Sequence, residues 1–155
     1  METAIDASTV REEVLQFVTF TLNNEEYAVD ILSVQEINRI TEITKIPNSP
    51  DYVEGVVNLR GKVIPVINLR KKFSFEEKLI DDTSRIIIMD IQDITYGVIV
   101  DAVSEVLRVP SSTVEPTPPM SSEANSKFIK GLAKLDGRLI ILIDIDNLID
   151  EELQI

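Results

Sequence analysis

Two stretches of the chain carry the same pattern of residues. The segment Tyr27 to Val29 recurs as Tyr96 to Val98, and the longer segment Gly55 to Ile67 recurs as Gly131 to Ile143 with its glycines and several apolar residues in register. A unit of about 60 to 70 residues that occurs twice is too short for a solenoid array, and such agreement in spacing is typical of a duplicated domain. We therefore predict that the chain contains two copies of one small domain.

Each copy is built from short segments rich in Val, Ile, Phe and Thr that end at turn residues. This pattern is typical of strands joined by tight turns, and five such strands suggest a small antiparallel barrel. The expected strands of the first copy are Leu15 to Leu22, Glu26 to Asp30, Val34 to Ile40, Val56 to Arg60 and Lys62 to Leu69, with a turn at Asn23 and Asn24. The sequence thus predicts an all-β fold of two packed five-stranded barrels.

We expect few helices. The candidates are short turns near Ser49 to Val53 and at Arg70 to Phe73, and a C-terminal helix from Asp146 onward. The predicted domain organisation is a flexible N-terminal tail at 1–13, a first barrel at 14–80, and a second barrel with the C-terminal helix at 81–155.

The last strand of each copy indicates how the barrels are related. Lys62 to Leu69 and its counterpart, Arg138 to Ile145, are apolar on both faces for most of their length. A single small barrel would expose one of those faces to water, so we expect the two barrels to pack together and share a core. Pro65 cannot donate a backbone hydrogen bond, which predicts an edge or a bulge in the first barrel. Its counterpart Ile141 has no such restriction.

The composition gives no support to an enzyme. The chain contains no histidine and no cysteine, so the commonest general base, the commonest metal ligand and the thiol nucleophile are all missing. No glycine-rich phosphate-binding motif occurs. Asp144 and Asp146 could hold a hard cation, but the end of a strand and the cap of a helix explain them better. We predict no catalytic residues, no cofactor and no metal site.

Nucleic acid and lipid are also poor candidates for the main partner. The formal net charge is -12 at pH 7, and aromatic residues make up only 5% of the chain. A strongly acidic protein repels phosphate backbones and anionic membranes, and the few aromatic residues leave little for base stacking. No apolar run approaches the roughly 20 residues of a membrane span, and the N-terminus lacks the features of a secretory signal. A protein-binding module is the reading that remains.

One segment departs from the acidic average. Asn58 to Lys72 holds five cations and no acid. By the alternation of side chains along a strand, Asn58 and Arg60 share one outward face. In the second copy their counterparts are Lys134 and Asp136. The residues alone leave two interpretations open, a solvated strand end or a site present in one copy.

The strings NLRGKVIPVINLR, EEYAVDILSVQEI and TYGVIVDAVSEVLRV resemble the CheW family of chemotaxis coupling proteins, and the resemblance runs from about Val14 to Leu148. It implies two five-stranded barrels like SH3 domains on a shared core, and no catalytic activity. It also implies a role as an adaptor between the cytoplasmic tips of methyl-accepting chemoreceptors and the regulatory domain of the histidine kinase CheA. Asn68 stands where the family often has Asp.

The resemblance also implies a receptor-binding site in a groove between the barrels. Carried over by motif, its residues are Val34, Glu36, Asn58, Arg60, Gly61, Ile86 and Ile87. We hypothesise that Glu36 and Arg60 form an ion pair there. The equivalent residues of the second copy, Glu105 and Asp136, are both acidic, so the pair is expected only once. The alternative for Arg60 is a solvated strand residue, and for Val34, Ile86 and Ile87 it is plain core.

Two relatives share the same module, the CheV adaptor and the regulatory domain of the kinase itself. A stand-alone interaction module of either kind is the alternative reading. The chain has little room for a receiver or kinase domain, which favours a free-standing coupling protein. We expect a cytoplasmic protein at receptor arrays that is a monomer in isolation, with the kinase on a second surface that the sequence does not define.

Overall fold

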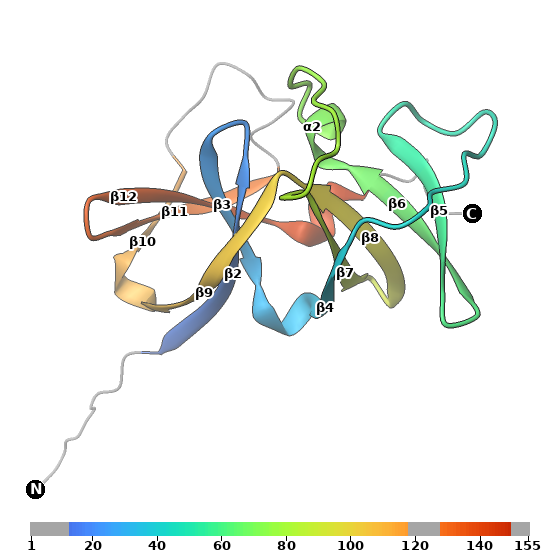
Figure 1. Cartoon of the computed structure of the whole chain (residues 1–155). Helices are drawn as coiled ribbons and strands as arrows, with labels where there is room; N and C mark the ends of the chain where they lie inside the picture. Colours follow the sequence, from blue (N-terminus) through green and yellow to red (C-terminus); the bar gives the residue numbers. More distant parts are fainter. Residues whose placement is uncertain (1–12, 118–127, 150–155) are drawn as a thin grey trace, which may run out of the picture.

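The computed structural model describes residues 13–117 and 128–149, and the chain forms two β-sheets with a few single-turn helices in the connections (Figure 1). The six-stranded sheet has the order β10 (Val114–Glu115), β11 (Ile129–Leu135), β12 (Arg138–Ile143), β3 (Glu25–Asp30), β2 (Val14–Leu22) and β9 (Ala102–Pro110). The five-stranded sheet has the order β4 (Val34–Arg39), β7 (Arg85–Ile91), β8 (Ile94–Val100), β6 (Lys62–Asn68) and β5 (Val53–Leu59). The helical turns are η1 (Ile31–Ser33), α2 (Leu69–Lys72), η2 (Ser111–Thr113) and η3 (Ile145–Leu148).

The predicted all-β class with two SH3-like units is confirmed, with differences in detail. The sixth strand of the larger sheet is the two-residue β10, and its counterpart in the smaller sheet is a single bridge between Thr44 and Val56. Of the expected helical turns, α2 is present, while the segment near Ser49 forms non-helical turns. The described part of the chain closes with the 3-10 turn η3, and the expected C-terminal helix and tail 1–13 fall mostly on residues outside it.

The strands are not distributed as one barrel per half of the sequence. The hairpin β2–β3 of the first repeat pairs with β12 and β9 of the second repeat, and the hairpin β7–β8 of the second repeat pairs with β6 and β4 of the first. Each sheet therefore takes two strands from one repeat and the rest from the other, which corrects the predicted division at 14–80 and 81–155. The exchange uses parallel pairing, β3 against β12 and β6 against β8.

A core shared by both sheets lies between them, as the sequence predicted. Its buried members include Phe20, Leu22 and Tyr27 from the six-stranded sheet and Met89 and Tyr96 from the five-stranded sheet. Two smaller clusters lie within the individual sheets, one around Phe17 and Leu142 and one around Ile86 and Ile64. The shared cluster fixes the sheets relative to each other, because its apolar side chains would be exposed to water on separation.

Tight hairpin turns place the loops, and they explain why certain polar residues stand where they do. Both central residues of a type I′ turn need a positive φ, which Asn and Gly adopt most readily. Asn23 and Asn24 have φ angles of 54° and 65°, confirming that turn, and Arg60 and Gly61 have 52° and 83°. Arg60 therefore lies in the β5–β6 turn, and not on the strand beside Asn58 as the period-2 reading suggested.

Pro65 lies in the middle of β6, where it is paired on one side only. It faces Val56 of β5, while the parallel pairing of β6 with β8 begins one residue later at Val66. The counterpart Ile141 is paired on both sides, to Leu132 and to Tyr27. The missing N–H thus falls where the strand has a free edge, as predicted.

No helix in the described residues is long and apolar enough to span a membrane.

Candidate functional site

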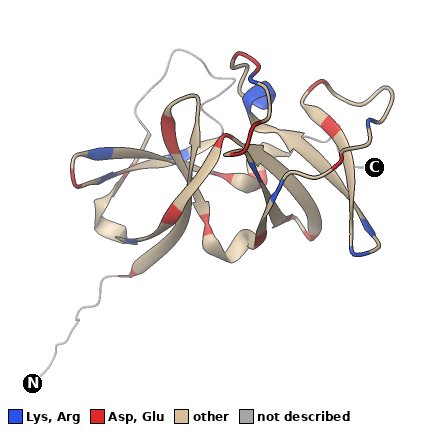
Figure 2. Ribbon diagram, in the orientation of Figure 1, with Lys and Arg blue, Asp and Glu red and all other residues tan. Residues whose placement is uncertain are grey.

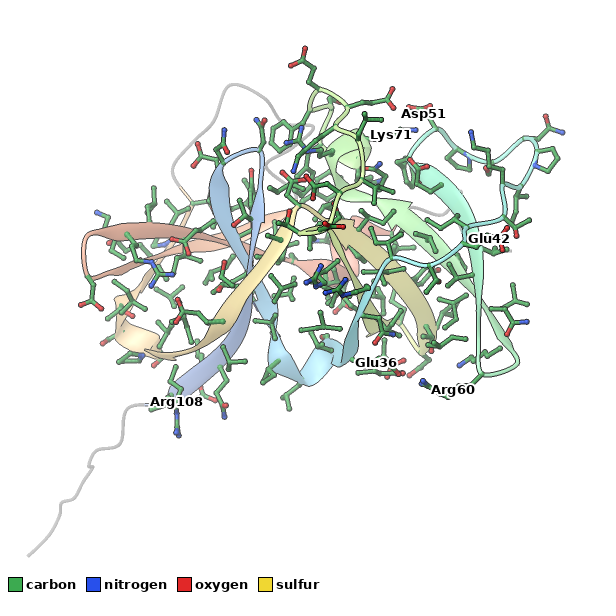
Figure 3. The ribbon with its side chains drawn as sticks, viewed as in Figure 1. Glu36, Glu42, Asp51, Arg60, Lys71 and Arg108 are labelled. Atoms are coloured by element: carbon green, nitrogen blue, oxygen red, sulfur yellow. The ribbon has the colours of Figure 1, made fainter. Side chains whose placement is uncertain are left out.

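The β5–β6 turn carries Arg60 to the side chain of Glu36 on β4, the opposite edge strand of the same sheet. The two guanidinium nitrogens of Arg60 donate to the two carboxylate oxygens, with Nη1 at 3.3 Å from Oε1 and Nη2 closer still to Oε2. The Arg60 side chain is 69% exposed, so the pair lies at the surface (Figure 3). The hypothesised ion pair is present in the structure.

Neighbouring side chains hold the pair in place. Asn38 donates from Nδ2 to Glu36 Oε1 at 3.0 Å, and Asn58 Oδ1 accepts the backbone N–H of Gly61 at 2.9 Å, which fixes the turn that carries Arg60. The Arg60 guanidinium, together with the Asn38 amide, lowers the pKa of Glu36 below its ordinary value. Glu36 therefore stays ionised under ordinary conditions, and its bidentate pairing sets the direction in which Arg60 points.

The apolar residues of the predicted site have different environments. Val34 is half-buried at the start of β4 and packs against the shared core. Ile87 belongs to that core with 1% of its surface exposed, so a partner cannot reach it. Ile86 is 3% exposed but lines a small pocket together with Asn58. The structure thus brings Glu36, Asn58, Arg60 and Gly61 together at one surface and places Ile87 behind it.

The second repeat has an ion pair of its own, but not between the residues equivalent to Glu36 and Arg60. Glu105 and Asp136 do not pair, but Arg138 bridges Glu105 at 3.1 Å and Glu26 more closely still. The position equivalent to Arg138 in the first repeat is Lys62, which donates instead to the hydroxyl of Thr95 at 3.1 Å. The repeat comparison did not predict the contact with Arg138, because Arg138 lies two residues beyond Asp136, the equivalent of Arg60.

The basic segment Asn58 to Lys72 does not form one patch. Its cations divide between the β5–β6 turn and α2 (Figure 2). At α2, Arg70 pairs with Asp101 at 2.9 Å and Lys71 pairs with Glu54 at 3.0 Å. These pairs neutralise that end of the segment, so its charge cannot act as a single docking surface.

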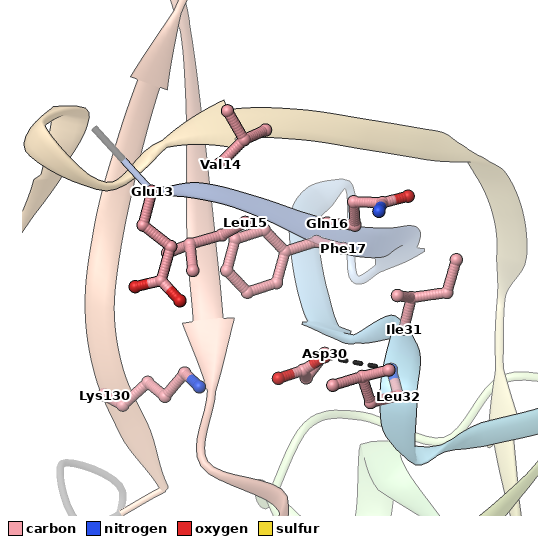
Figure 4. A pocket seen from close by; sticks show the side chains of 9 residues that line it. All are labelled: Glu13, Val14, Leu15, Gln16, Phe17, Asp30, Ile31, Leu32 and Lys130. Carbon is pink, nitrogen blue, oxygen red and sulfur yellow. Dashed lines mark hydrogen bonds between the residues drawn. The ribbon is translucent and has the colours of Figure 1, made fainter. Parts of the chain in front are cut away.

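A second candidate surface, which sequence reasoning missed, lies where β2 begins and β3 ends. A cleft of about 220 Å³ is bordered there by apolar Leu15 and Phe17 and by Lys130 across from Asp30 (Figure 4). Leu32 stands at its edge on η1 with 90% of its surface exposed, held by its N–H bond to Asp30 Oδ1 at 2.9 Å. An exposed leucine on a fixed turn beside an apolar cleft is suited to a protein partner. The sequence signal was the apolar pair Ile31-Leu32 in a connection.

In the described residues no cluster of three or more Asp and Glu could hold a metal ion. The polar groups around Arg60 are an ion pair, the Asn38 amide that donates to it and the Asn58 amide that accepts the N–H of Gly61, an arrangement suited to orienting a partner.

Comparison with known proteins agrees with this geometry. The CheW-like domain family matches residues 16–153 of the chain. The chemotaxis protein CheW of Klebsiella aerogenes is 39% identical over 137 residues, covering 88% of this chain and 82% of the relative, and that of Thermotoga maritima is 38% identical over 138 residues, covering 88% of each. The crystal structure of the scaffolding protein TtCheW from Thermoanaerobacter tengcongensis superposes with a TM-score of 0.82 at 41% identity, covering 88% of this chain and 92% of that one. This chain therefore belongs to the CheW-like family of chemotaxis scaffold proteins.

Proposed function

We propose that the chain is a non-enzymatic adaptor that couples methyl-accepting chemoreceptors to the histidine kinase CheA. The match to the CheW-like family over residues 16–153 carries the proposal. The lack of histidine and cysteine in the sequence supports a role in binding over one in catalysis. The adaptor acts in the cytoplasm at receptor arrays, is a monomer in isolation, needs no cofactor and binds no nucleic acid.

The surface we assign to partner binding comprises Val34, Glu36, Asn58, Arg60 and Gly61. The Glu36–Arg60 pair lies exposed on a turn that Asn58 holds, and Val34 supplies a half-buried apolar contact beside it. Charged groups at the margin of an apolar contact set the orientation of a partner more than they add affinity. Ile87 does not contact the partner, and its side chain supports β7 from the shared core. Ile86 contributes through the pocket that it lines.

Binding assays with two purified partners test the proposal. The chain is mixed with a chemoreceptor cytoplasmic fragment and, separately, with the regulatory domain of CheA, and each dissociation constant is measured by calorimetry. We expect both to bind. The Arg60→Glu variant places two carboxylates side by side and should lose receptor binding while its thermal midpoint stays close to that of the wild type.

The matched control is Arg108→Glu, because Arg108 is an exposed arginine on the other sheet and lies away from the assigned surface (Figure 3). This variant should bind both partners as the wild type does. Failure of the wild type to bind either fragment would contradict the adaptor role, and unfolding of Arg60→Glu would make Arg60 a structural residue.

A further inference from the structure

A small pocket opens beside the Glu36–Arg60 pair, at the end of the five-stranded sheet. Its volume is about 210 Å³ and its walls are the side chains of Val57, Leu59, Ile86 and Ile88. An apolar cavity of about 150 Å³ is already large enough to hold benzene, so this one has room for a leucine, methionine or phenylalanine side chain.

The rim of the pocket is polar and adjoins the assigned surface directly. Asn38 and Asn58 both border it, and they are the residues that bond to Glu36 and to the N–H of Gly61. A group that enters the pocket would therefore lie next to the ion pair. The pocket and the pair form parts of one continuous surface.

The corresponding end of the other sheet is built differently. The repeat places Phe17 where the pocket has Ile86 and Leu107 where it has Asn38, and both belong to or pack on the buried cluster of that sheet. Phe17 and Ile86 are equally buried, with 2% and 3% of their surfaces exposed, so the difference between the two positions is the size of the side chain. The two repeats thus diverge at these two positions, and only the end beside Arg60 carries the smaller and more polar pair.

Arg39, which borders the pocket, stands next to a second arginine. Arg39 of β4 lies directly across from Arg85 of β7 in the antiparallel ladder, whereas its counterpart Arg108 lies across from the neutral Gln16. Like charges in opposite positions of a ladder are unfavourable. Arg85 donates to the backbone oxygens of Asp82 and Ser84 at 2.7 and 2.8 Å, and among the described residues no carboxylate forms an ion pair with Arg39.

We propose that the pocket and the Arg39–Arg85 pair form one docking site for a partner segment that carries an apolar side chain next to a carboxylate. This inference rests on the proposed function and names the chemistry that the assigned surface selects. The apolar side chain fills the pocket, and the carboxylate relieves the repulsion between the two arginines. Arg39 and Arg85 make this region cationic on a protein whose net charge is -12. Charge complementarity therefore favours a partner segment that carries a carboxylate.

The other sheet supplies the residues for the test. Asn38→Leu and Ile86→Phe introduce the side chains found at the equivalent positions, Leu107 and Phe17, and should fill the pocket. Arg39→Gln removes the like charge and introduces the residue type that faces Arg108. We expect each variant to weaken binding of the receptor fragment or of the kinase regulatory domain by about 10-fold or more, as loss of a central apolar anchor or a charged contact does.

Three controls accompany these variants. Asn38→Ala deletes the same hydrogen bond to Glu36 as Asn38→Leu but leaves the pocket open, so it should bind more tightly than Asn38→Leu. Arg108→Gln makes the same charge change on the other sheet and should bind as the wild type does. Thermal midpoints establish that each variant is folded, and Asn38→Leu alone decides the matter if Ile86→Phe does not fold.

The outcomes separate this inference from the proposed function. Loss of binding in Arg60→Glu with wild-type binding in Arg39→Gln and Asn38→Leu would overturn the docking site and leave the adaptor role intact. If the wild type binds neither partner, the adaptor role fails. The docking site is then tested separately by adding the peptide acetyl-Leu-Asp-amide to the wild type. Methyl NMR shifts at Val57 and Ile88 that Asn38→Leu abolishes would support it, and their absence would overturn it. Self-association that Asn38→Leu abolishes would assign the pocket to a second copy and overturn the partner assignment.

Discussion

Gly55 and Gly61 belong to the same hairpin, and each is a glycine for a different reason. A β-carbon on Gly55 would lie 2.1 Å from the backbone oxygen of Thr44, which is far inside contact distance, and the φ angle of Gly55 is 147°. A β-carbon on Gly61 would meet nothing within 4 Å, and only its φ angle of 83° is unfavourable for other residues. Close approach of the Thr44 backbone decides the first position, and turn conformation decides the second.

We therefore predict different losses of stability for the two alanine variants. Gly61→Ala should lower the free energy of unfolding by about 1 kcal/mol, the usual cost of alanine at positive φ. Gly55→Ala should lower it by more than about 3 kcal/mol, because a backbone segment must move. Urea unfolding of both variants measures the difference. Equal losses would show that residues near Thr44 move aside without cost.

The Glu36–Arg60 pair shows what residue-level reasoning could and could not reach. The repeat and the family motif predicted the pair, because both residues sit in strings with a specific order. The same reasoning missed Asn38, which donates to Glu36, because an asparagine on a strand has no distinctive pattern. The family motif also assigned Ile87 to the site, whereas its side chain lies in the shared core, and alternation along a strand does not tell which face meets a second sheet.

At the scale of elements, the short helix α2 connects parts of the molecule that are distant in sequence. Asn68 caps it by accepting the N–H of Lys71 at 3.3 Å and donates to Glu54 at 2.9 Å. Arg70 donates through two nitrogens to Asp101, at 2.9 Å each, and Asp101 also accepts the N–H of Asn23 at 2.9 Å. A helix of four residues has little stability of its own, so these bonds hold it in place.

Asp101 gives this junction a predictable pH dependence. Burial alone would raise the pKa of Asp101, but the bonds from Arg70 and Asn23 outweigh it and lower the pKa below its ordinary value of 3.8. A carboxylate with a lowered pKa in the folded state contributes stability above its unfolded pKa and loses it as the pH falls through the folded pKa. The junction should therefore hold at neutral pH and weaken below a pH of about 4.

We expect Asp101→Asn to lower the free energy of unfolding at neutral pH by about 1 to 2 kcal/mol, near the lower end for charged hydrogen bonds because solvent reaches the pair. The loss should shrink as the pH is lowered, since the wild type then loses the same charge. Urea unfolding between a pH of about 2 and 7 measures both effects. A loss that stays constant over this range would assign the effect to packing instead of charge.

At the scale of the whole molecule, the exchanged hairpins divide the fold differently from the repeats. Residues of the five-stranded sheet run continuously from β4 to β8, and the six-stranded sheet is made from what precedes and follows them. Sequence could not distinguish this arrangement from two separate barrels, because duplicated strands offer the same partners in either case. The repeat, the strands and the shared core were predictable, whereas the choice between equivalent partners was not.

Cutting the chain between residues 80 and 81 tests this arrangement. Each half then lacks the hairpin or the strands with which its own strands pair, so neither half should fold alone. An equimolar mixture should recover native structure, because all pairing partners are then present. Amide dispersion in NMR spectra of the halves and of the mixture measures this, with the intact chain as the reference. Two halves that fold independently would contradict the exchange.

The exchange also bears on how such a protein withstands tension. The chain passes from one sheet to the other at η1 and again at Asp101. If two neighbours pull on opposite ends, the force is carried by these two covalent connections as well as by the apolar seam. Separating the sheets would then require strands to lose their hydrogen-bonded partners. The molecule should therefore resist stretching better than two domains that are held together by apolar contact alone.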